Sequence, residues 1–355
     1  MKAFLELVDG TKFYGEAKGA LRSVSGEVVF TTSMVGYPEA ISDPSYYGQI
    51  LVFTQPMIGN YGVPASGRDE WGLPFGLESE HAQVRGIVVQ ELWEGVGHLK
   101  MERRLVDWLR QEGVVALCGV DTRALTKRLR ECGTMLGRIV VNGKVPEWDD
   151  PNARDVLGDV VWLGRRRFGS GKKRVLLVDC GCKASILRSL LERKVAVLTL
   201  PYGEDILRCV DDVDGVLLSN GPGDPAKAER LIGQVRELLR RGIAVFGICL
   251  GNQILGLAAG ARTYKLRYGH RSSNQPVEDL RTGKGFVTSQ NHGFAVDGES
   301  LPPGWEVTHR NANDGTVEGL ADEGLRAFGV QFHPEARPGP TDAAYLFDTF
   351  LEALA

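Results

Sequence analysis

The sequence predicts an α/β protein: an N-terminal mixed α/β domain, then a domain built on a mostly parallel open sheet with helices on both faces. The chain has 355 residues, which is longer than a single hydrophobic core usually organises. Hydrophobic residues make up 43% and charged residues 25%, as in ordinary globular proteins. After residue 174, continuous apolar runs alternate with helical periodicity, which is typical of parallel strands covered on both faces.

We expect an N-terminal domain over 1–145, a linker over 146–173 and a second domain over 174–355. In the first domain Asp9-Gly10 predicts a hairpin turn. Apolar runs then predict strands and periodic leucines predict helices; the expected strands include 28–30, 50–53 and 87–89, and the helices 105–109 and 125–129. In the second domain the expected strands are 175–178, 195–200, 216–219, 243–248, 286–289, 307–310 and 328–332. The expected helices are 186–191, 206–210, 231–239, one from about 252, and 343–354.

Charge and composition exclude several classes of function. There are 42 Lys and Arg against 45 Asp and Glu, so a bulk electrostatic grip on nucleic acid or anionic lipid is not expected. The basic run at 164–174 is interpreted as a solvated linker. It is not a phosphate-binding loop, because Arg166 and Lys173 stand where that motif needs glycine and serine or threonine.

One uncharged stretch, 242–261, is long enough to cross a bilayer. Its repeated glycines, with Asn252 and Gln253 at its centre, favour a buried strand, a tight turn and a buried helix instead. Glu6 interrupts the N-terminal apolar run, so we expect no secretory signal there. The six cysteines contain no CxxC motif, so we expect reduced thiols and a cytoplasmic location.

The sharpest local feature is Gly247-Ile248-Cys249-Leu250-Gly251, between a predicted strand and a predicted helix. It is the GxSxG nucleophile elbow with cysteine as the nucleophile. So tight a reversal leaves no room for side chains beside Cys249. It also places the thiol at a helix N-terminus, where the dipole favours thiolate. Taken alone, the motif could also be a buried cysteine in a glycine-rich turn.

A thiol nucleophile needs a base, and His333 is the best candidate because it ends an apolar strand. Pro334 keeps His333 extended, so Glu335 should project to the same side and orient the imidazole. The loop at 219–225 follows another strand and contains glycines whose N–H groups could complete an oxyanion hole. All three motifs fall at the carboxyl ends of strands, where ligands bind in open α/β sheets.

These motifs together resemble the class I, triad-type glutamine amidotransferases. In the first half, three segments resemble the small subunit of carbamoyl phosphate synthetase: Gly36-Tyr37-Pro38-Glu39 with Asp43-Pro44-Ser45-Tyr46, 56–62, and 119–126. The resemblance implies a Cys249 nucleophile, a His333 base and acid, and an orienting Glu335. Gly221 and Leu250 would supply oxyanion N–H groups. The glutamine-binding residues implied are Ser45, Gly221, Gly223, Leu250, Gln253, Asn291, Gly293 and Phe294. Without the resemblance, 43–45 would be a plain turn and 290–293 a hairpin.

The resemblance implies a ligase subunit that hydrolyses glutamine and passes ammonia to a large partner, in a heterodimer or a higher oligomer of heterodimers. It implies no metal and no cofactor in this chain; ATP, Mg²⁺ and bicarbonate would bind the large partner. The product would serve pyrimidine synthesis, arginine synthesis or both. No role in binding nucleic acid or membrane is expected.

Two departures from the family pattern fall outside the expected triad. Asn252 stands where the family commonly has histidine, and Arg271, Ser272, Ser273 and Gln275 replace a glycine pair and a further histidine. Three other functions stay open. The chain could serve another synthase, such as anthranilate or guanylate synthesis, although the first-half motifs argue against this. It could be a non-catalytic glutamine-binding scaffold, or a hydrolase of esters or peptides.

Overall fold

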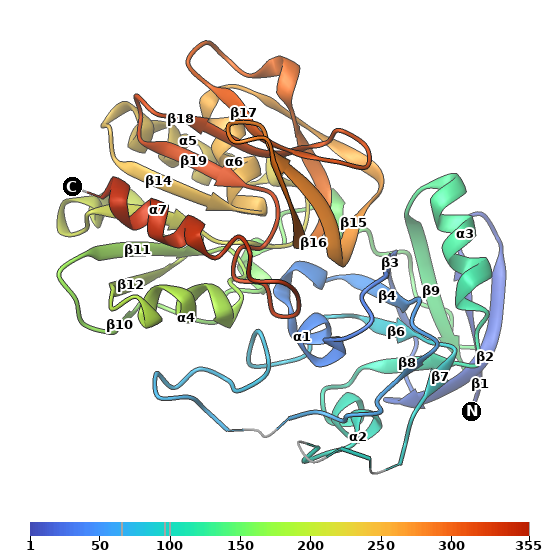
Figure 1. Cartoon of the computed structure of the whole chain (residues 1–355). Helices are drawn as coiled ribbons and strands as arrows, with labels where there is room; N and C mark the ends of the chain where they lie inside the picture. The colour runs from blue at the N-terminus through green and yellow to red at the C-terminus, as the bar shows by residue number, and fades with distance from the viewer. Residues whose placement is uncertain (65–66, 96, 99–100, 355) are drawn as a thin grey trace. The chain divides into compact units, whose positions relative to one another are not determined.

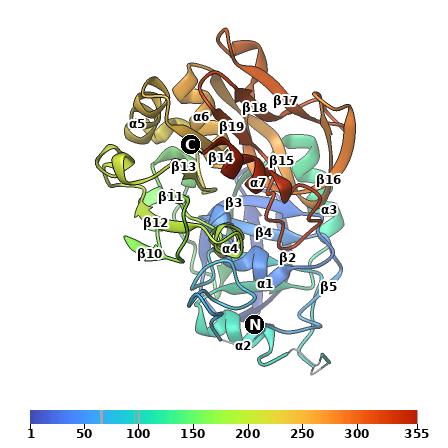
Figure 2. The same ribbon diagram turned by 60° about the vertical axis from the view of Figure 1, so that its left-hand side comes forward.

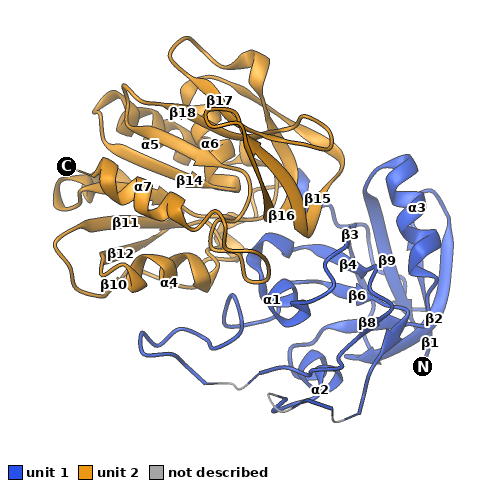
Figure 3. Cartoon of the chain, viewed as in Figure 1, with its two compact units in different colours: residues 1–153 blue, residues 154–355 orange. Residues whose placement is uncertain are grey.

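A computed structural model describes residues 1–64, 67–95, 97–98 and 101–354. The chain divides into two compact units, residues 1–153 and 154–355, coloured separately in Figure 3. The boundary between the units falls inside the segment expected to be a linker. Each unit has its own sheet and its own core, so each is described by itself.

Unit 1 is a closed barrel with the strand order β1-β2-β8-β6-β4-β3-β9. Its strands are β1 (Lys2–Leu7), β2 (Lys12–Gly19), β3 (Val24–Thr31), β4 (Gln49–Phe53), β6 (Gly86–Val88), β8 (Val115–Cys118) and β9 (Met135–Val141). Its helices are α1 (Tyr37–Ser42), α2 (Leu105–Gln111) and α3 (Thr122–Cys132), and β5 (Met57–Ile58) pairs with β7 (Glu91–Leu92). The predicted hairpin is confirmed, since β1 and β2 pair antiparallel across Asp9-Gly10.

The parallel part of the barrel is also the most buried. Strands β3, β4, β6 and β8 pair in parallel in this order, and every residue in them is buried. Strands β9, β1 and β2 close the barrel through antiparallel pairs. Helices α1 and α2 supply Ile41 and Trp108 to the core on one side of the parallel strands. Burial on both faces explains why β4, β6 and β8 are mainly apolar rather than alternating, whereas β3 also buries Ser25 and Glu27.

Unit 2 is built on a ten-stranded sheet with the order β10-β12-β11-β13-β14-β19-β18-β17-β15-β16. Its strands are β10 (Arg166–Phe168), β11 (Arg174–Asp179), β12 (Ala196–Pro201), β13 (Gly215–Leu218), β14 (Ala244–Ile248), β15 (Arg262–Asp279), β16 (Lys284–Asp297), β17 (Glu306–Asn311), β18 (Val317–Asp322) and β19 (Ala327–Val330). Strands β12, β11, β13, β14 and β19 are parallel, and antiparallel strands extend this centre at both edges.

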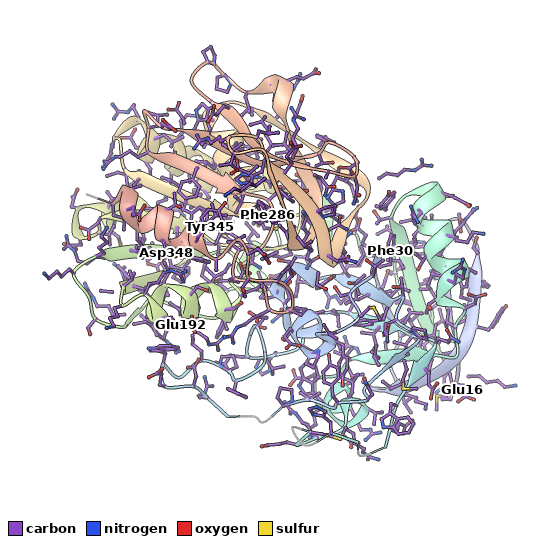
Figure 4. The ribbon with its side chains drawn as sticks, viewed as in Figure 1. Glu16, Phe30, Glu192, Phe286, Tyr345 and Asp348 are labelled. Carbon is purple, nitrogen blue, oxygen red and sulfur yellow. The ribbon has the colours of Figure 1, made fainter. Side chains whose placement is uncertain are left out.

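Helices cover both faces of the parallel centre. They are α4 (Ala184–Glu192), α5 (Glu229–Arg240), α6 (Leu250–Ala259) and α7 (Tyr345–Ala353). In Figures 1 and 2, α4 and α7 lie on one face and α5 and α6 on the other. Arg193, just after α4, pairs with Asp348 of α7 at 2.7 Å; Asp348 is labelled in Figure 4. The α/β class and the helices on both faces are therefore as predicted.

The segment 146–173 contains two 3₁₀ helices and β10, and it belongs partly to each unit. Trp148 lies under the Arg138 guanidinium, 4.3 Å from it, and the Asp149 amide donates to Ser25 Oγ at 3.1 Å, both in unit 1. From residue 154 onward the segment belongs to unit 2, where Leu157 is part of the core and β10 pairs with β12.

Short 3₁₀ helices connect the larger elements: Pro44–Tyr46, Pro151–Ala153, Leu157–Asp159, Ile206–Arg208, Val210–Asp212, Pro225–Lys227 and Gly298–Ser300. The uncharged stretch 242–261 forms β14, a tight turn and α6, as predicted. In the part of the chain that the structure describes, no helix is long and apolar enough to cross a membrane.

Candidate active site

The turn between β14 and α6 holds Cys249 in a strained backbone conformation, with φ 55° and ψ −104°. The flanking glycines are required by contact distances rather than by flexibility. A Cβ on Gly247 would lie 2.5 Å from the Gly251 carbonyl, and one on Gly251 would lie 2.2 Å from the Leu218 carbonyl. This confirms the prediction that no side chain fits beside the cysteine. Strain of this kind persists where surrounding structure enforces it, most often at functional sites.

The Cys249 thiol is buried and held from two sides. Its backbone N–H donates to Val330 O at 2.8 Å, which ties the turn to the neighbouring strand β19. The Sγ atom lies 3.6 Å from Asn291 O, to which it donates. Gln331 Nε2 donates to the same sulfur, also at 3.6 Å. The thiol therefore lies among residues of β14, β16 and the end of β19.

His333 and Glu335 lie just beyond β19, and His333 Nδ1 is 2.7 Å from Glu335 Oε1. The predicted contact is confirmed, but the extended backbone that we expected between the two residues is wrong. Ala336 N donates to His333 O at 3.1 Å and Ala336 has φ +59°, so residues 333–336 form a turn. The turn brings the carboxylate back to the imidazole, whereas alternation along a strand would only have put the two on one side.

Lys183 is a buried cation in this cluster that our sequence reasoning did not identify. It precedes α4, and its Nζ donates to Glu335 Oε1 at 2.9 Å and to Ala336 O at 2.7 Å. Its backbone N–H donates to Asn220 Oδ1 at 2.9 Å. The available signal was its position, since Lys183 lies just after the end of β11, as the other motifs lie just after β13, β14 and β19.

Asp179 shapes the loop that presents Lys183. One carboxylate oxygen accepts the N–H groups of Gly181 and Cys182, at 2.9 and 2.8 Å. The other accepts the N–H groups of Trp162 and Leu163, at 3.1 and 2.9 Å. Four backbone donors converge on this one buried side chain, which fixes the turn between β11 and α4.

Opposed charges set the proton affinities of the cluster. Burial alone would lower the pKa of His333, but the charge of Glu335 and the nearby Cys249 thiol outweigh it and raise the pKa to about 10. Burial alone would raise the pKa of Glu335, but Lys183 and His333 lower it to about 2. Glu335 is therefore a carboxylate in the folded protein, and it favours the charged form of the imidazole.

His333 Nε2 is buried and makes no hydrogen bond of normal geometry within the described residues. The thiol lies near enough to affect the pKa of this imidazole, yet the sulfur's own hydrogen bonds go to Asn291 and Gln331. Contacts between a nucleophile and its base are often loose before substrate binds. The free nitrogen is thus positioned to accept the proton of the thiol.

Among the glutamine-binding residues implied for unit 2, Asn291 contacts the thiol through its carbonyl. Gly221 and Leu250 adjoin: a Cβ on Gly221 would lie 2.8 Å from the Leu250 side chain. Leu250 is the first residue of α6, where N–H groups lack intrahelical partners. Gln253 Nε2 donates to Phe294 O at 2.8 Å. Asn291, Gly293 and Phe294 lie within β16, so the alternative expectation of a hairpin at 290–293 is wrong. Gly223 has φ +81° in the loop after β13.

Ser45 belongs to unit 1. It lies in the 3₁₀ helix Pro44–Tyr46, where its N–H donates to Asp43 Oδ1 at 2.9 Å. The part that Ser45 would play in binding glutamine stays a prediction, as does the division of the site between two domains.

Gln331 is a further residue of this cluster that our sequence reasoning did not identify. It donates to the Cys249 sulfur, and its Oε1 accepts from Gln253 Nε2 at 3.0 Å. Residues two apart on a strand share a face, so Gln331 could have been inferred from His333. Between them Phe332 is turned away, with its ring 5.7 Å from that of Phe286, which is labelled in Figure 4.

The two departures from the family pattern have different surroundings. Asn252 is fully buried in α6, and neither polar atom of its side chain finds a hydrogen-bond partner among the described residues. It packs against Gly329, where a Cβ would lie 2.6 Å from Asn252 Oδ1. Arg271 lies on β15, where its guanidinium donates to Tyr268 O at 2.7 Å. Ser272 contacts Asn274 on the same strand.

Comparison with known proteins agrees with this arrangement. Residues 176–353 match the family model for glutamine amidotransferase class-I, and residues 5–139 match that for the carbamoyl-phosphate synthase small chain, CPSase domain. The chain is 45% identical over 358 residues to the carbamoyl phosphate synthase arginine-specific small chain of Chaetomium globosum, covering 99% of this chain and 78% of the relative.

Two further matches are a multifunctional protein and a solved structure. The multifunctional protein pyr1-3 of Dictyostelium discoideum is 43% identical over 373 residues, which cover 99% of this chain and 17% of the relative. A solved glutamine amidotransferase from Thermotoga maritima aligns with a TM-score of 0.40 and 21% identity, over 52% of this chain and 87% of that one.

Proposed function

The chain belongs to the family of carbamoyl-phosphate synthase small chains, and from this premise we propose that it is the glutamine-hydrolysing subunit of such a synthase. One structural observation supports the proposal most strongly. A strained, buried cysteine at a strand–helix turn lies beside a histidine whose Nδ1 is 2.7 Å from a buried carboxylate. This is the arrangement that nucleophilic acyl transfer requires.

The first step is attack by the Cys249 sulfur on the side-chain amide carbon of glutamine. His333 Nε2 accepts the thiol proton, and the carbon–oxygen double bond opens to an oxyanion. The N–H groups of Gly221 and Leu250 are the proposed donors to that oxyanion. Loss of one such donor typically costs ~2.7–4 kcal/mol of barrier stabilisation.

In the second step His333 returns the proton to the amide nitrogen as the carbon–nitrogen bond breaks. Ammonia leaves and a glutamyl thioester remains on Cys249. His333 then takes a proton from water, whose oxygen attacks the thioester, and the thiol is restored as glutamate departs. Acid–base help of this kind contributes ~10²–10⁴ in rate.

Glu335 and Lys183 act through His333 rather than on substrate. Glu335 holds Nδ1, so Nε2 is the nitrogen that faces the chemistry. Lys183 keeps Glu335 ionised, because its Nζ lies 2.9 Å from the carboxylate. Ser45, Gly223, Gln253, Asn291, Gly293 and Phe294 are the remaining proposed glutamine contacts.

We assign ATP, Mg²⁺ and bicarbonate to a large partner chain, which would receive the ammonia. This agrees with the lack of a phosphate-loop motif in the sequence. A heterodimer or an oligomer of heterodimers in the cytoplasm is the proposed assembly. One relative is named arginine-specific and another pyr1-3, so the proposal covers product use in arginine or pyrimidine synthesis.

Labelling with a glutamine-derived electrophile tests the proposal without the partner. We expect one adduct per chain, located at Cys249 by peptide mapping and blocked by excess glutamine. The adduct should be absent in Cys249→Ser and unchanged in Cys132→Ser, since Cys132 is exposed and remote in sequence. Adducts spread over several cysteines, or an adduct at Cys249 that glutamine does not block, would contradict it.

If the folded protein does not react alone, the assay is repeated with the large chain present. Continued absence of an adduct there would favour a non-catalytic scaffold. Glutamate release by the complex, abolished in Cys249→Ser and retained in Cys132→Ser, would support the proposed function.

A further inference from the structure

A second cluster of buried titratable groups lies in unit 2, on the antiparallel strands. It consists of His270 on β15, His292 on β16 and Glu318 on β18, and their ligating atoms lie within 4.8 Å of one another. The proposed glutaminase chemistry uses none of the three. All three are buried, and Gln290 reaches into the same space from β16.

The outer nitrogen of each imidazole is already committed. His270 Nε2 lies 2.9 Å from Asp314 Oδ2, and His292 Nδ1 lies 2.9 Å from Phe294 O. A carboxylate and a carbonyl only accept, so these contacts assign the N–H to His270 Nε2 and to His292 Nδ1. Metal-binding histidines nearly always carry such an outer carboxylate or carbonyl partner.

The inner nitrogens and two oxygens therefore face one another. Gln290 Oε1 lies 3.0 Å from His270 Nδ1 and 3.1 Å from His292 Nε2. Glu318 Oε1 lies 3.2 Å from His270 Nδ1 and 3.9 Å from His292 Nε2. Donors around tetrahedral zinc, with bonds of ~2.0–2.1 Å, lie about 3.3–3.4 Å apart, so these separations are close to a zinc site.

The orientation of the Gln290 amide is fixed by its other end. Its Nε2 donates to Thr288 Oγ1 at 3.1 Å, and the Thr288 hydroxyl donates in turn to Gln275 O at 3.0 Å. Turning the amide over would leave two acceptors facing each other, since the Thr288 proton is already used. Oε1 is therefore the atom directed at the histidines.

Hydrogen bonds alone do not satisfy this cluster. Asn311 Nδ2 donates to Glu318 Oε1 at 3.1 Å and lies 3.3 Å from His270 Nδ1. A proton on His270 Nδ1 could be donated to Gln290 or Glu318. The lone pair of His292 Nε2 would still face two acceptor oxygens. Glu318 Oε2 is buried and has no hydrogen-bond partner among the described residues. A buried polar atom left unpaired costs about 1–3 kcal/mol. A cation among the four inner atoms would remove the mismatch at His292 Nε2.

We propose that His270, His292, Glu318 and Gln290 bind one divalent transition-metal cation of the zinc type. Two imidazoles and a carboxylate suit Zn²⁺ or Co²⁺, whereas Mg²⁺ and Ca²⁺ prefer oxygen ligands throughout. Four protein donors leave no position for water, so the site is structural rather than catalytic. It joins β15, β16 and β18 beside Asn291, whose carbonyl accepts from the Cys249 thiol. It revises our expectation that the chain holds no metal.

Co²⁺ added to the chelator-stripped full chain tests the site, in a Cys249→Ala background that removes a competing thiol. We expect one Co²⁺ per chain, the visible bands of tetrahedral Co²⁺ and no thiolate charge-transfer band. Zn²⁺ should displace the Co²⁺, and the melting temperature should rise with either ion but not with Mg²⁺. No tetrahedral spectrum, or one with a thiolate band, would overturn the proposal.

Substitutions then locate the ion. Glu318→Gln keeps the shape and removes a ligand charge, and we expect Co²⁺ affinity to fall at least tenfold. Asp314→Asn weakens the outer contact and should cost about 10–100-fold in affinity. His309→Gln is the matched control, since His309 is a buried histidine outside the cluster, and should bind as the parent does. Equal Co²⁺ affinity in all three variants would refute the site. If Glu318→Gln does not fold, the Co²⁺ affinity of Asp314→Asn tests the site, because Asp314 is partly exposed and its substitution should be tolerated.

Discussion

Unit 2 contains two buried histidine–carboxylate clusters with opposite electrostatics. Glu335 and Glu318 are equally buried, yet the pKa of Glu335 falls to about 2 whereas burial raises the pKa of Glu318 above its usual value. The difference is Lys183, whose Nζ lies 2.9 Å from Glu335; the groups that act on Glu318 are His270, Asn311 and Asp314. Burial therefore does not determine the state of a carboxyl group; its partners do.

The histidines differ in what they face. Burial opposes the charged form of both, but Glu335 raises the pKa of His333 to about 10, and Asp314 and Glu318 raise that of His270 to about 9. His333 faces a thiol, whereas His270 faces a second imidazole, whose own pKa is lowered by burial and by the His270 charge. The same residue types thus face a thiol in one cluster and a second imidazole in the other.

The largest expected effect distinguishes His333 from a buried histidine that lies outside both clusters. His333→Asn removes the base and acid, and we expect glutamine hydrolysis to fall by ~10³-fold or more. His309→Gln should leave hydrolysis within about twofold, because His309 is a buried histidine that contacts Phe332 but lies outside the cluster. The measurement is glutamate release by the complex. Equal losses in both variants would mean that the effect is one of folding.

The next prediction concerns Lys183, the cation that Glu335 has as a partner and Glu318 lacks. Lys183→Met removes the buried cation, and we expect the free energy of unfolding to fall by about 3 kcal/mol, because a buried charge loses a partner. The pKa of Glu335 should rise and hydrolysis should fall about tenfold to hundredfold. Denaturant unfolding and glutamate release measure the two effects.

The exposed Lys227→Met is the matched control and should change neither quantity. Lys183→Met with full hydrolysis would show that the lysine only supports the fold. A shifted pH–rate profile together with the loss would instead identify it as a positioning residue.

The third expected effect appears only in acid. The pKa of Glu335 lies near 2 in the folded chain, below its unfolded value of 4.5, so its stabilising contribution is present above pH 4.5. That contribution is lost as the pH falls from 4.5 to 2, and the shift corresponds to about 3 kcal/mol. Glu335→Gln should lose this pH dependence in acid unfolding curves.

Glu318→Gln in metal-free buffer is the matched control. The pKa of Glu318 is raised, so any stabilisation from it is present below pH 4.5 and is lost as the pH rises. Its substitution should leave the slope between pH 4.5 and 2 unchanged. A flattened slope in this variant, with an unchanged slope in Glu335→Gln, would reverse the comparison.

Much of unit 2 could be predicted because its signals are contiguous. The turn at Cys249 follows from Gly247 and Gly251, which the backbone contacts require, and from apolar runs on either side. The β1–β2 hairpin likewise follows from Asp9-Gly10. The closed barrel of unit 1 could not be predicted, because closure depends on β1 pairing with β9, more than a hundred residues away.

Sequence by itself located the cysteine, the histidine and the carboxylate of the candidate site, because each lies in a short motif at the end of an apolar strand. Tertiary structure alone decided which charges meet. Lys183 reaches Glu335 across 152 residues of chain, and the strand order places β11 and β19 on either side of β13 and β14. His270, His292 and Glu318 come together from three strands in the same way. Backbone sterics act over a few residues and can be predicted locally, whereas charge pairing depends on strand order, which the packing of the whole sheet sets.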